Sequence, residues 1–237
     1  MPRMGRLIIP NYPHHIIHRG HNRQALFASD DDYRYYLNNL AEWKEKLGCR
    51  LYAYCLMTNH IHLIVDPGDD PESLAKLMKR VAGRQTRYVN RIERRSGTLW
   101  EGRYRSSIIC KDTYLLACCR YVEMNPVRAC MVTHPSGYRW SSYREKTGEG
   151  LEIVDPDPAF MGLAADEAGR KHAYEQWVLS GVPEGEWEKI REAVQRGHLT
   201  GKHQLEEEVA EKLGVRVELK KPGRPRKRFD SKNIREK

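Results

Sequence analysis

Amphipathic stretches and short apolar runs alternate along the first 145 or so residues of the chain. Apolar residues recur at helical spacing in three stretches, at about 29–47, 71–95 and 112–125. The first stretch opens with Ser29 and three aspartates, which is typical of a helix N-terminus, and Gly48 follows its last apolar residue. The pattern therefore predicts three helices in this part of the chain.

Four short segments between these stretches have the character of strands, at about 14–19, 49–57, 60–65 and 104–110. The order is strand, helix, strand, strand, helix, strand, followed by an added helix. That order is typical of the split βαβ, ferredoxin-like pattern. We therefore expect an α+β fold in which an antiparallel four-stranded sheet carries helices on one face.

The periodicity weakens in the C-terminal part of the chain. Residues 145–160 contain several Gly and Pro residues and predict an irregular linker. Helices are expected at about 166–180, 186–196 and 204–213, and the basic, proline-containing end predicts disorder. The expected organisation is a first domain at 1–145, a helical C-terminal extension at 146–215 and a basic DNA-binding tail at 216–237.

Charge narrows the classes of partner. Lys and Arg number 41 against 32 Asp and Glu, and a net charge of +9 favours a polyanionic partner such as nucleic acid. No apolar run approaches the ~20 residues that cross a bilayer, and the N-terminus lacks a signal-peptide pattern, so we expect a cytoplasmic protein with no membrane partner. Its six cysteines include no C-x-x-C pair, which disfavours a structural zinc site.

His60 and His62 flank Ile61 in the third predicted strand. Residues two apart in a strand share a face, so the two imidazoles should stand together while Ile61 points to the core. Two neighbouring imidazoles on a rigid strand can hold a divalent metal. Taken alone, however, the pair is better interpreted as two surface histidines.

Tyr121 and Asn125 are four residues apart in the third predicted helix, which Pro126 should end. A tyrosine hydroxyl near a metal-polarised phosphate can attack phosphorus and form a covalent phosphotyrosine. A lone tyrosine in an amphipathic helix is more often a core residue. The presence of this helix together with the histidine pair favours a functional role for Tyr121 over a purely structural one.

Residues 57–63, which contain the histidine pair, and residues 121–129, which begin with Tyr121, together resemble the REP-associated tyrosine transposases. These proteins are single-tyrosine members of the HUH endonuclease superfamily. Segments 19–24, 99–107 and 138–143 are similar to the same family, as is the basic end of the chain. The resemblance covers about residues 10–145 and again the tail.

By this resemblance, the chain is a metal-dependent endonuclease and strand transferase. His60 and His62 match the metal-binding pair, Tyr121 matches the nucleophile that forms a 5′-phosphotyrosine, and Asn125 takes the position of a third, amide-type ligand. The implied cofactor is Mg²⁺ or Mn²⁺. The implied partner is single-stranded DNA with a hairpin formed by a palindromic repeat, bound by a monomer or weak homodimer.

Basic residues in the first domain and in the tail are candidates for DNA contacts. Arg84, Arg87 and Arg91 share one helix face at spacings of three and four. The tail resembles half of an AT-hook, and phosphate contacts without sequence preference are its expected role. The predicted DNA-binding residues are Arg19, Arg23, Arg84, Arg87, Arg91, Arg103, Arg105, Lys220, Lys221, Arg224, Arg226, Lys227 and Arg228.

Two alternatives remain open at this point. A domesticated DNA-binding or genome-organising protein would keep the site and cut little DNA. A metallohydrolase with a water nucleophile would leave Tyr121 without a role.

Overall fold

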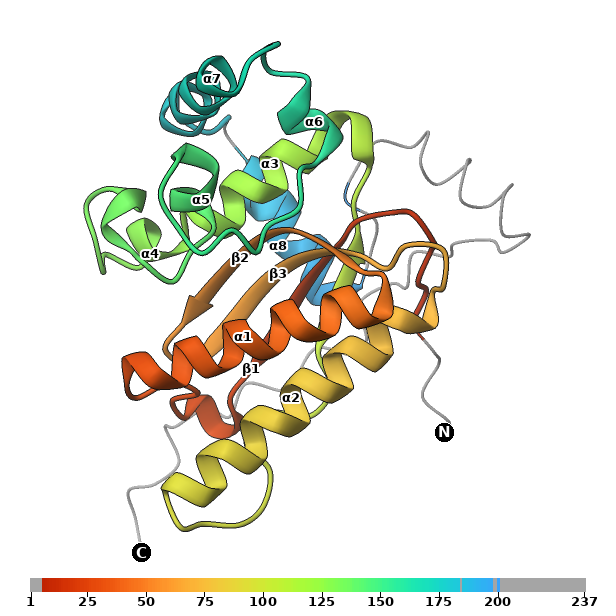
Figure 1. Ribbon diagram of the computed structural model, residues 1–237, viewed down its shortest axis with the longest axis vertical. Coiled ribbons are helices and arrows are strands. Elements are labelled where there is room, and N and C mark those ends of the chain that lie inside the picture. Colours follow the sequence, from red (N-terminus) through yellow and green to blue (C-terminus); the bar gives the residue numbers. More distant parts are fainter. Residues whose placement is uncertain (1–5, 184, 198–199, 201–237) are drawn as a thin grey trace, which may run out of the picture.

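The computed structural model describes residues 6–183, 185–197 and 200, which form an α+β fold around one sheet (Figure 1). The strand order is β2–β3–β1–β4, and each neighbouring pair is antiparallel. This is the predicted ferredoxin-like arrangement, and that prediction is confirmed. The strands are β1 (His14–Arg19), β2 (Arg50–Met57), β3 (His60–Asp66) and β4 (Arg105–Ile108).

Helices cover both faces of the sheet (Figure 1). The helices α1 (Asp30–Leu47) and α2 (Glu72–Ile92) pack together on one face, as predicted. The later helices α3 (Lys111–Glu123) and α8 (Glu186–Arg196) lie on the other face, so the expectation of helices on one face holds for α1 and α2 but not for α3. The remaining elements are η1 (His21–Arg23), α4 (Asn125–Arg128), η2 (Pro135–Gly137), α5 (Tyr143–Thr147), α6 (Pro158–Met161) and α7 (Glu167–Leu179).

The strand β3 divides its side chains between two environments. Ile61, Leu63 and Val65 are fully buried in the main hydrophobic core. Because successive side chains alternate across a strand, His60 and His62 stand on the opposite face. The strand register places His62 beside Ile17 of β1 and Cys55 of β2 on that face. The predicted separation of histidines from core residues is therefore confirmed.

The helix that carries Tyr121 ends earlier than predicted. The helix α3 finishes at Glu123, and Asn125 opens the separate short helix α4, with Pro126 in its first turn. A proline lacks the N–H that would continue the helical hydrogen bonds, but it is well tolerated in a first turn. Tyr121 and Asn125 therefore lie on either side of a helix break, and the prediction of one continuous helix was wrong.

The described part of the C-terminal extension shares the core of the first domain. The helix α8 contacts β4, β1 and α3, and its Ile190 is fully buried in the same cluster as the strand residues. The helices expected at 166–180 and 186–196 are observed as α7 and α8. The helix expected at 204–213 and the predicted tail at 216–237 lie outside the described residues.

The predicted linker at 145–160 is partly helical, because α5 runs to Thr147 and α6 begins at Pro158. Between these helices, the backbone N–H groups of Ile153 (2.8 Å) and Val154 (3.0 Å) donate to Oε2 of Glu145 in α5. The segment is therefore fastened to the domain by specific polar contacts. In the described part of the chain, no helix combines the length and apolarity that a membrane span requires.

One buried histidine gives the fold a pH dependence. His14 is inaccessible to solvent, its Nδ1 hydrogen-bonds the Tyr12 carbonyl at 2.7 Å, and its Nε2 accepts from the Ile9 N–H at 3.3 Å. Burial lowers the pKa of His14 to about 4. Below pH ~6.5 the unfolded chain therefore binds a proton that the folded chain does not, and stability should fall towards pH 4 by up to ~1.4 kcal/mol per pH unit.

Urea unfolding between pH 8 and pH 4.5 tests this expectation. The free energy of unfolding of His14→Gln should fall less steeply below pH 6.5 than that of the wild type, by about one proton. His172→Gln, which removes an exposed histidine, should keep the wild-type slope. Equal slopes in all three proteins would contradict the assignment of the linkage to His14.

Candidate active site

The histidine pair is held by neighbours that fix the orientation of each ring. His60 Nδ1 lies 2.7 Å from Oδ1 of Asn59, and His62 Nδ1 lies 3.0 Å from Nε2 of His15. The two ring centroids of the pair are 5.1 Å apart. A carbonyl oxygen only accepts, so Nδ1 of His60 carries the proton and its Nε2 keeps a lone pair. His62 is left in the same state when it donates to His15 through Nδ1.

Both imidazoles are held in the neutral form that binds metals. Burial, followed by the charge of Arg19, lowers the pKa of His60 to about 4. Burial also holds the pKa of His62 well below its usual value, with further lowering by His15, His60 and two arginines, Arg128 and Arg19. A neutral imidazole offers a lone pair at neutral pH, and such donors suit divalent cations.

Tyr121 reaches the histidines from the helix above the sheet. Its ring centroid lies 5.9 Å from that of His62 and 5.4 Å from that of His15. The indole of Trp187, on α8, lies 5.2 Å away on a tilted plane. Tyr121 is only 4% exposed as a result. The two parts of the predicted site, far apart in sequence, are therefore brought together.

Asn125 is adjacent to this site, at the break between α3 and α4. Its Nδ2 donates to the carbonyls of Tyr121 (2.8 Å) and Val122 (3.1 Å), so its amide nitrogen is occupied by the end of α3. Only the side-chain oxygen can then serve as a ligand. The amide also fixes the last turn of the helix that carries Tyr121.

This donor set fits a divalent metal. Two neutral imidazoles with their Nδ1 atoms occupied, and one amide oxygen, are borderline to hard ligands. In residues 6–183, 185–197 and 200, no group of three or more His, Cys, Asp or Glu side chains is arranged to hold a metal. In the candidate site, the atoms that could hold a metal are Nε2 of His60, Nε2 of His62 and the side-chain oxygen of Asn125.

Three of the predicted DNA-binding arginines border a cavity beside the site. Arg19, Arg103 and Arg105, together with Glu101 and Gln195, line a cavity of about 160 Å³. Arg19 is paired across the sheet with His60, which places this basic cavity next to the histidine pair. A fourth, Arg23, is the last residue of η1, where its carbonyl accepts from Nδ2 of Asn59 at 3.3 Å.

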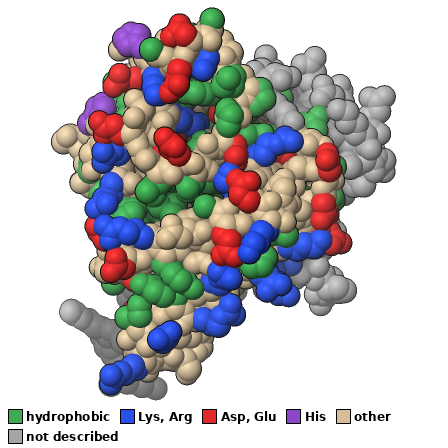
Figure 2. All heavy atoms as spheres, viewed as in Figure 1, with side chains coloured by type: hydrophobic (Ala, Val, Ile, Leu, Met, Phe, Trp, Pro, Cys, Tyr) green, Lys and Arg blue, Asp and Glu red, His purple; other side chains and the backbone are tan. Residues whose placement is uncertain are grey.

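The arginines of α2 lie on the other face of the sheet. Arg84 donates to Oδ1 of Asn39 (2.7 Å) and Oε2 of Glu42 (2.8 Å), so its charge is directed to α1. Arg87 and Arg91 of the same helix are exposed. Figure 2 shows that Lys and Arg side chains gather over α2. The structure therefore does not bring this group to the histidines. Lys220, Lys221, Arg224, Arg226, Lys227 and Arg228 lie outside the described residues.

Three site residues were missed by the sequence analysis. The first, Arg128, follows Tyr121 by seven residues. Its guanidinium carbon lies 5.2 Å from the Tyr121 ring centroid and 4.3 Å from that of Trp187. The helical spacing of residues 121, 125 and 128 was a signal that could have found it. His15 and Trp187 gave no such signal, because only the strand register and the packing of α8 bring them to the site.

The chain matches one known protein family. Residues 9–125 match the sequence model described as "Transposase IS200 like". This part of the chain therefore belongs to the IS200-like transposase family, and the resemblance drawn from the sequence is confirmed at that level. Membership supports a transposase-like function that acts on DNA. No curated protein matches the chain.

One solved structure of similar fold supports the same architecture, and a second is a weaker match. A structure described as a REP-associated tyrosine transposase bound to a REP hairpin is 16% identical, with a TM-score of 0.53, and the match covers 66% of this chain and 92% of that one. A transposase-like protein from Deinococcus radiodurans is 18% identical, with a TM-score of 0.33, over 49% of this chain and 91% of that one.

Proposed function

We propose that this chain is a metal-dependent single-strand DNA endonuclease and strand transferase that acts beside hairpin-forming palindromic repeats. The observation that carries the proposal is the convergence of Tyr121 with the His60–His62 pair, at 5.9 Å between the rings of Tyr121 and His62. A DNA-binding module has no use for a hydroxyl nucleophile beside two neutral imidazoles. The hairpin is suggested by the partner of the REP-associated transposase of similar fold.

The residues that would hold a divalent ion, Mg²⁺ or Mn²⁺, are His60, His62 and Asn125 through its side-chain oxygen. When bound, the ion supplies Lewis-acid stabilisation of the charge that grows on the scissile phosphate. The chain itself contributes the orientation of both imidazoles through Asn59 and His15. It also keeps both rings neutral by burying them.

Tyr121 is the proposed nucleophile. Its hydroxyl oxygen attacks the scissile phosphorus, the Oη–P bond forms, and the bond from phosphorus to the 3′-oxygen breaks. The phenol loses its proton to solvent, and the departing oxygen takes one up to become a free 3′-hydroxyl. The product is a 5′-phosphotyrosine, and attack on it by another 3′-hydroxyl reverses the step and joins two DNA ends without an external energy source.

Arg128 is the second cation of the proposed site. Its guanidinium is close to the Tyr121 ring and to Trp187, and the residue is exposed. A guanidinium can give two parallel hydrogen bonds to one phosphate. We assign it to a non-bridging oxygen of the scissile phosphate, while Arg19, Arg103 and Arg105 would follow the flanking strand.

One observation favours the rival function, a DNA-binding protein with little cleavage activity. Tyr121 is 4% exposed beneath Trp187, and its helix is joined to α8 by Arg120, which donates to Oε1 of Glu186 at 2.7 Å. DNA must displace this cover before the hydroxyl can reach phosphorus. The two functions differ in whether a covalent protein–DNA adduct forms.

Replacement of the nucleophile separates these functions. Tyr121→Phe should abolish the covalent adduct and the cleavage of an end-labelled hairpin, while hairpin affinity stays within about threefold, since only one hydroxyl is removed. Tyr143→Phe is the matched control, because this buried hydroxyl has no hydrogen-bond partner among the described residues. An adduct that persists in Tyr121→Phe, or a wild type that binds the hairpin without cutting it, would overturn the proposal.

Removal of the metal gives a second test. His60→Ala and His62→Ala should each lower the single-turnover cleavage rate at least about a hundredfold, because each removes a ligand of the charge-stabilising ion. Chelation should stop cleavage by the wild type, and added Mg²⁺ or Mn²⁺ should restore it. His172→Gln removes an exposed histidine and should have no effect. Full activity in excess chelator would exclude a metal.

The proposed contact between Arg128 and the scissile phosphate is tested by removing the charge of either partner. Arg128→Gln should lower the single-turnover rate on saturating hairpin about tenfold to a thousandfold, as loss of one oxyanion donor does. With a neutral methylphosphonate at the scissile position, wild type and variant should cut at similar rates. Lys76→Gln removes an exposed, ion-paired cation and serves as the control. An equal defect on both substrates would show that Arg128 does not meet that charge.

A further inference from the structure

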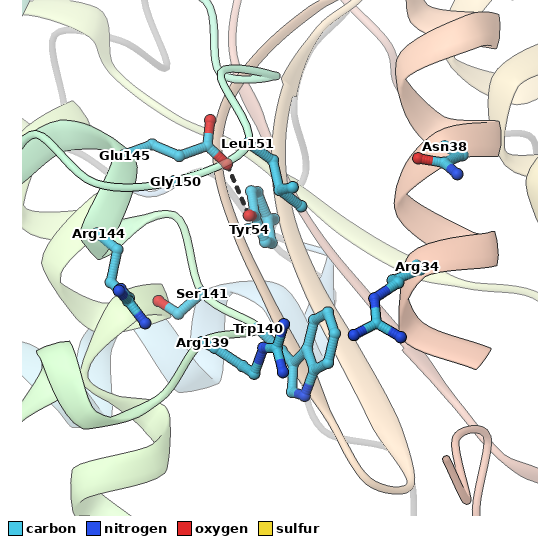
Figure 3. A pocket seen from close by; sticks show the side chains of 10 residues that line it. All are labelled: Arg34, Asn38, Tyr54, Arg139, Trp140, Ser141, Arg144, Glu145, Gly150 and Leu151. Carbon is cyan, nitrogen blue, oxygen red and sulfur yellow. Dashed lines mark hydrogen bonds between the residues drawn. The ribbon is translucent and has the colours of Figure 1, made fainter. Parts of the chain in front are cut away.

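A second cavity opens at the β2 edge of the sheet, between α1 and the segment 139–151 (Figure 3). Its volume is about 310 Å³, at the small end of the range for small-molecule sites. The segment 138–143 beside it is one of those that resemble the transposase family, and the proposed chemistry gives it no role. The cavity is therefore a candidate for a function that the catalytic residues do not explain.

Three guanidinium groups surround this cavity, from Arg34 on α1 and from Arg139 and Arg144 on the opposite wall (Figure 3). Each is paired with a carboxylate whose side chain is more than half exposed and does not line the cavity. Such exposed pairs are weak, so a phosphate can replace the carboxylates. The pairs are Arg34 with Asp31 (2.8 Å), Arg139 with Asp30 (2.7 Å) and Arg144 with Glu149 (2.6 Å).

The carboxylate that lines the cavity, Glu145, has both oxygens engaged. Its Oε1 accepts from the Tyr54 hydroxyl at 2.6 Å, the contact drawn in Figure 3, and its Oε2 accepts from the N–H groups of Ile153 and Val154. These three donors disperse its negative charge. The guanidinium groups are therefore the charged groups of the cavity that can bind a ligand, and they favour an anion.

A stack of planar groups ends at this cavity. Phe27 stacks on Tyr33 at 4.4 Å, Tyr33 stacks on Trp140 at 4.6 Å, and the Arg139 guanidinium lies 4.5 Å from the Trp140 ring centroid. Figure 3 shows the last two side chains together at the wall of the cavity. A guanidinium plane stacks well on aromatic groups, and a nucleobase would extend this series by one layer.

The cavity is also close to the candidate active site. Ser141, which lines it, is bridged to Cys55 of β2, and Cys55 is paired with His62 of β3. Neighbouring strands lie ~4.8 Å apart, so the backbones of Ser141 and His62 are about 10 Å apart, with the α1 wall of the cavity on the face away from the histidines. A strand of DNA that crosses the β2 edge can therefore reach both places.

We propose that this cavity binds one unpaired nucleotide of the DNA strand that the Tyr121 site acts on. The base stacks on the Arg139 guanidinium, and Arg34 and Arg144 hold its phosphate. The volume admits one nucleotide and excludes a duplex, which selects a flipped or unpaired base. This inference rests on the proposed function for its substrate, but it concerns binding and is tested without cleavage.

An abasic scan tests the assignment. Each unpaired nucleotide that flanks a hairpin is replaced in turn by an abasic site, and the Kd for Tyr121→Phe protein is measured by fluorescence anisotropy. One position should weaken binding about fivefold to a hundredfold, the loss of one base stack. The double variant Tyr121→Phe, Arg139→Gln should bind the unmodified DNA more weakly by the same factor. An abasic site at the sensitive nucleotide should then cause no further loss of affinity.

Three further variants in the same background complete the design. Arg139→Lys should keep most of the phosphate attraction and lose the sensitivity to the base. Arg34→Gln should weaken all DNAs equally and keep that sensitivity. Lys76→Gln, a loss of one exposed, paired cation elsewhere, should leave the scan unchanged. Urea midpoints of all variants should match the parent, since the replaced groups are at the surface.

Two results would overturn the inference. A flat scan in the parent protein, or a scan that Arg139→Gln leaves unchanged, would show that no base of the strand occupies the cavity. Free deoxynucleoside monophosphates that bind in an Arg139-dependent way, with a flat scan, would assign the cavity to a free nucleotide instead. Cleavage of the hairpin by the wild type would stand in either case, so failure here is distinguishable from failure of the proposed function.

Discussion

The site depends on the two-residue period of β3. Ile61, Leu63 and Val65 are fully buried in the main hydrophobic core, and strand alternation therefore places His60 and His62 on the other face. A shift of one residue in the pairing of this strand would exchange the two sets and place imidazoles in the apolar core. Burial of these three branched side chains therefore sets the register of β3, and that register sets the face on which the histidine pair lies.

Buried polar contacts then hold Tyr121, the proposed nucleophile, above that pair. On α3, Glu123 accepts from Ser142 and Tyr174 at 2.6 Å each, and Arg120 donates to Glu186. Charges this deeply buried are tolerated only when they are well paired, so these contacts specify one position for α3. Because Tyr174 and Glu186 belong to the C-terminal extension, that extension is part of what positions Tyr121.

The same packing creates a conflict that the proposed reaction must resolve. Trp187 and Arg128 lie against Tyr121, which orders the phenol but covers it. On the two sides of this site lie cavities bordered by arginines, one beside His60 and one at the β2 edge. Binding energy from a strand held at these flanking cavities can be used to displace the cover.

The sequence alone determined the strand and helix order, the two faces of β3 and the family motifs, because local periodicity and turn chemistry decide these features. The break between α3 and α4 was within reach, since Pro126 signalled it two residues away. His15, Trp187 and the cavity at Arg139 were decided only by tertiary structure. They join segments far apart in the chain through strand register and helix packing, and no local pattern encodes such contacts before the chain has folded.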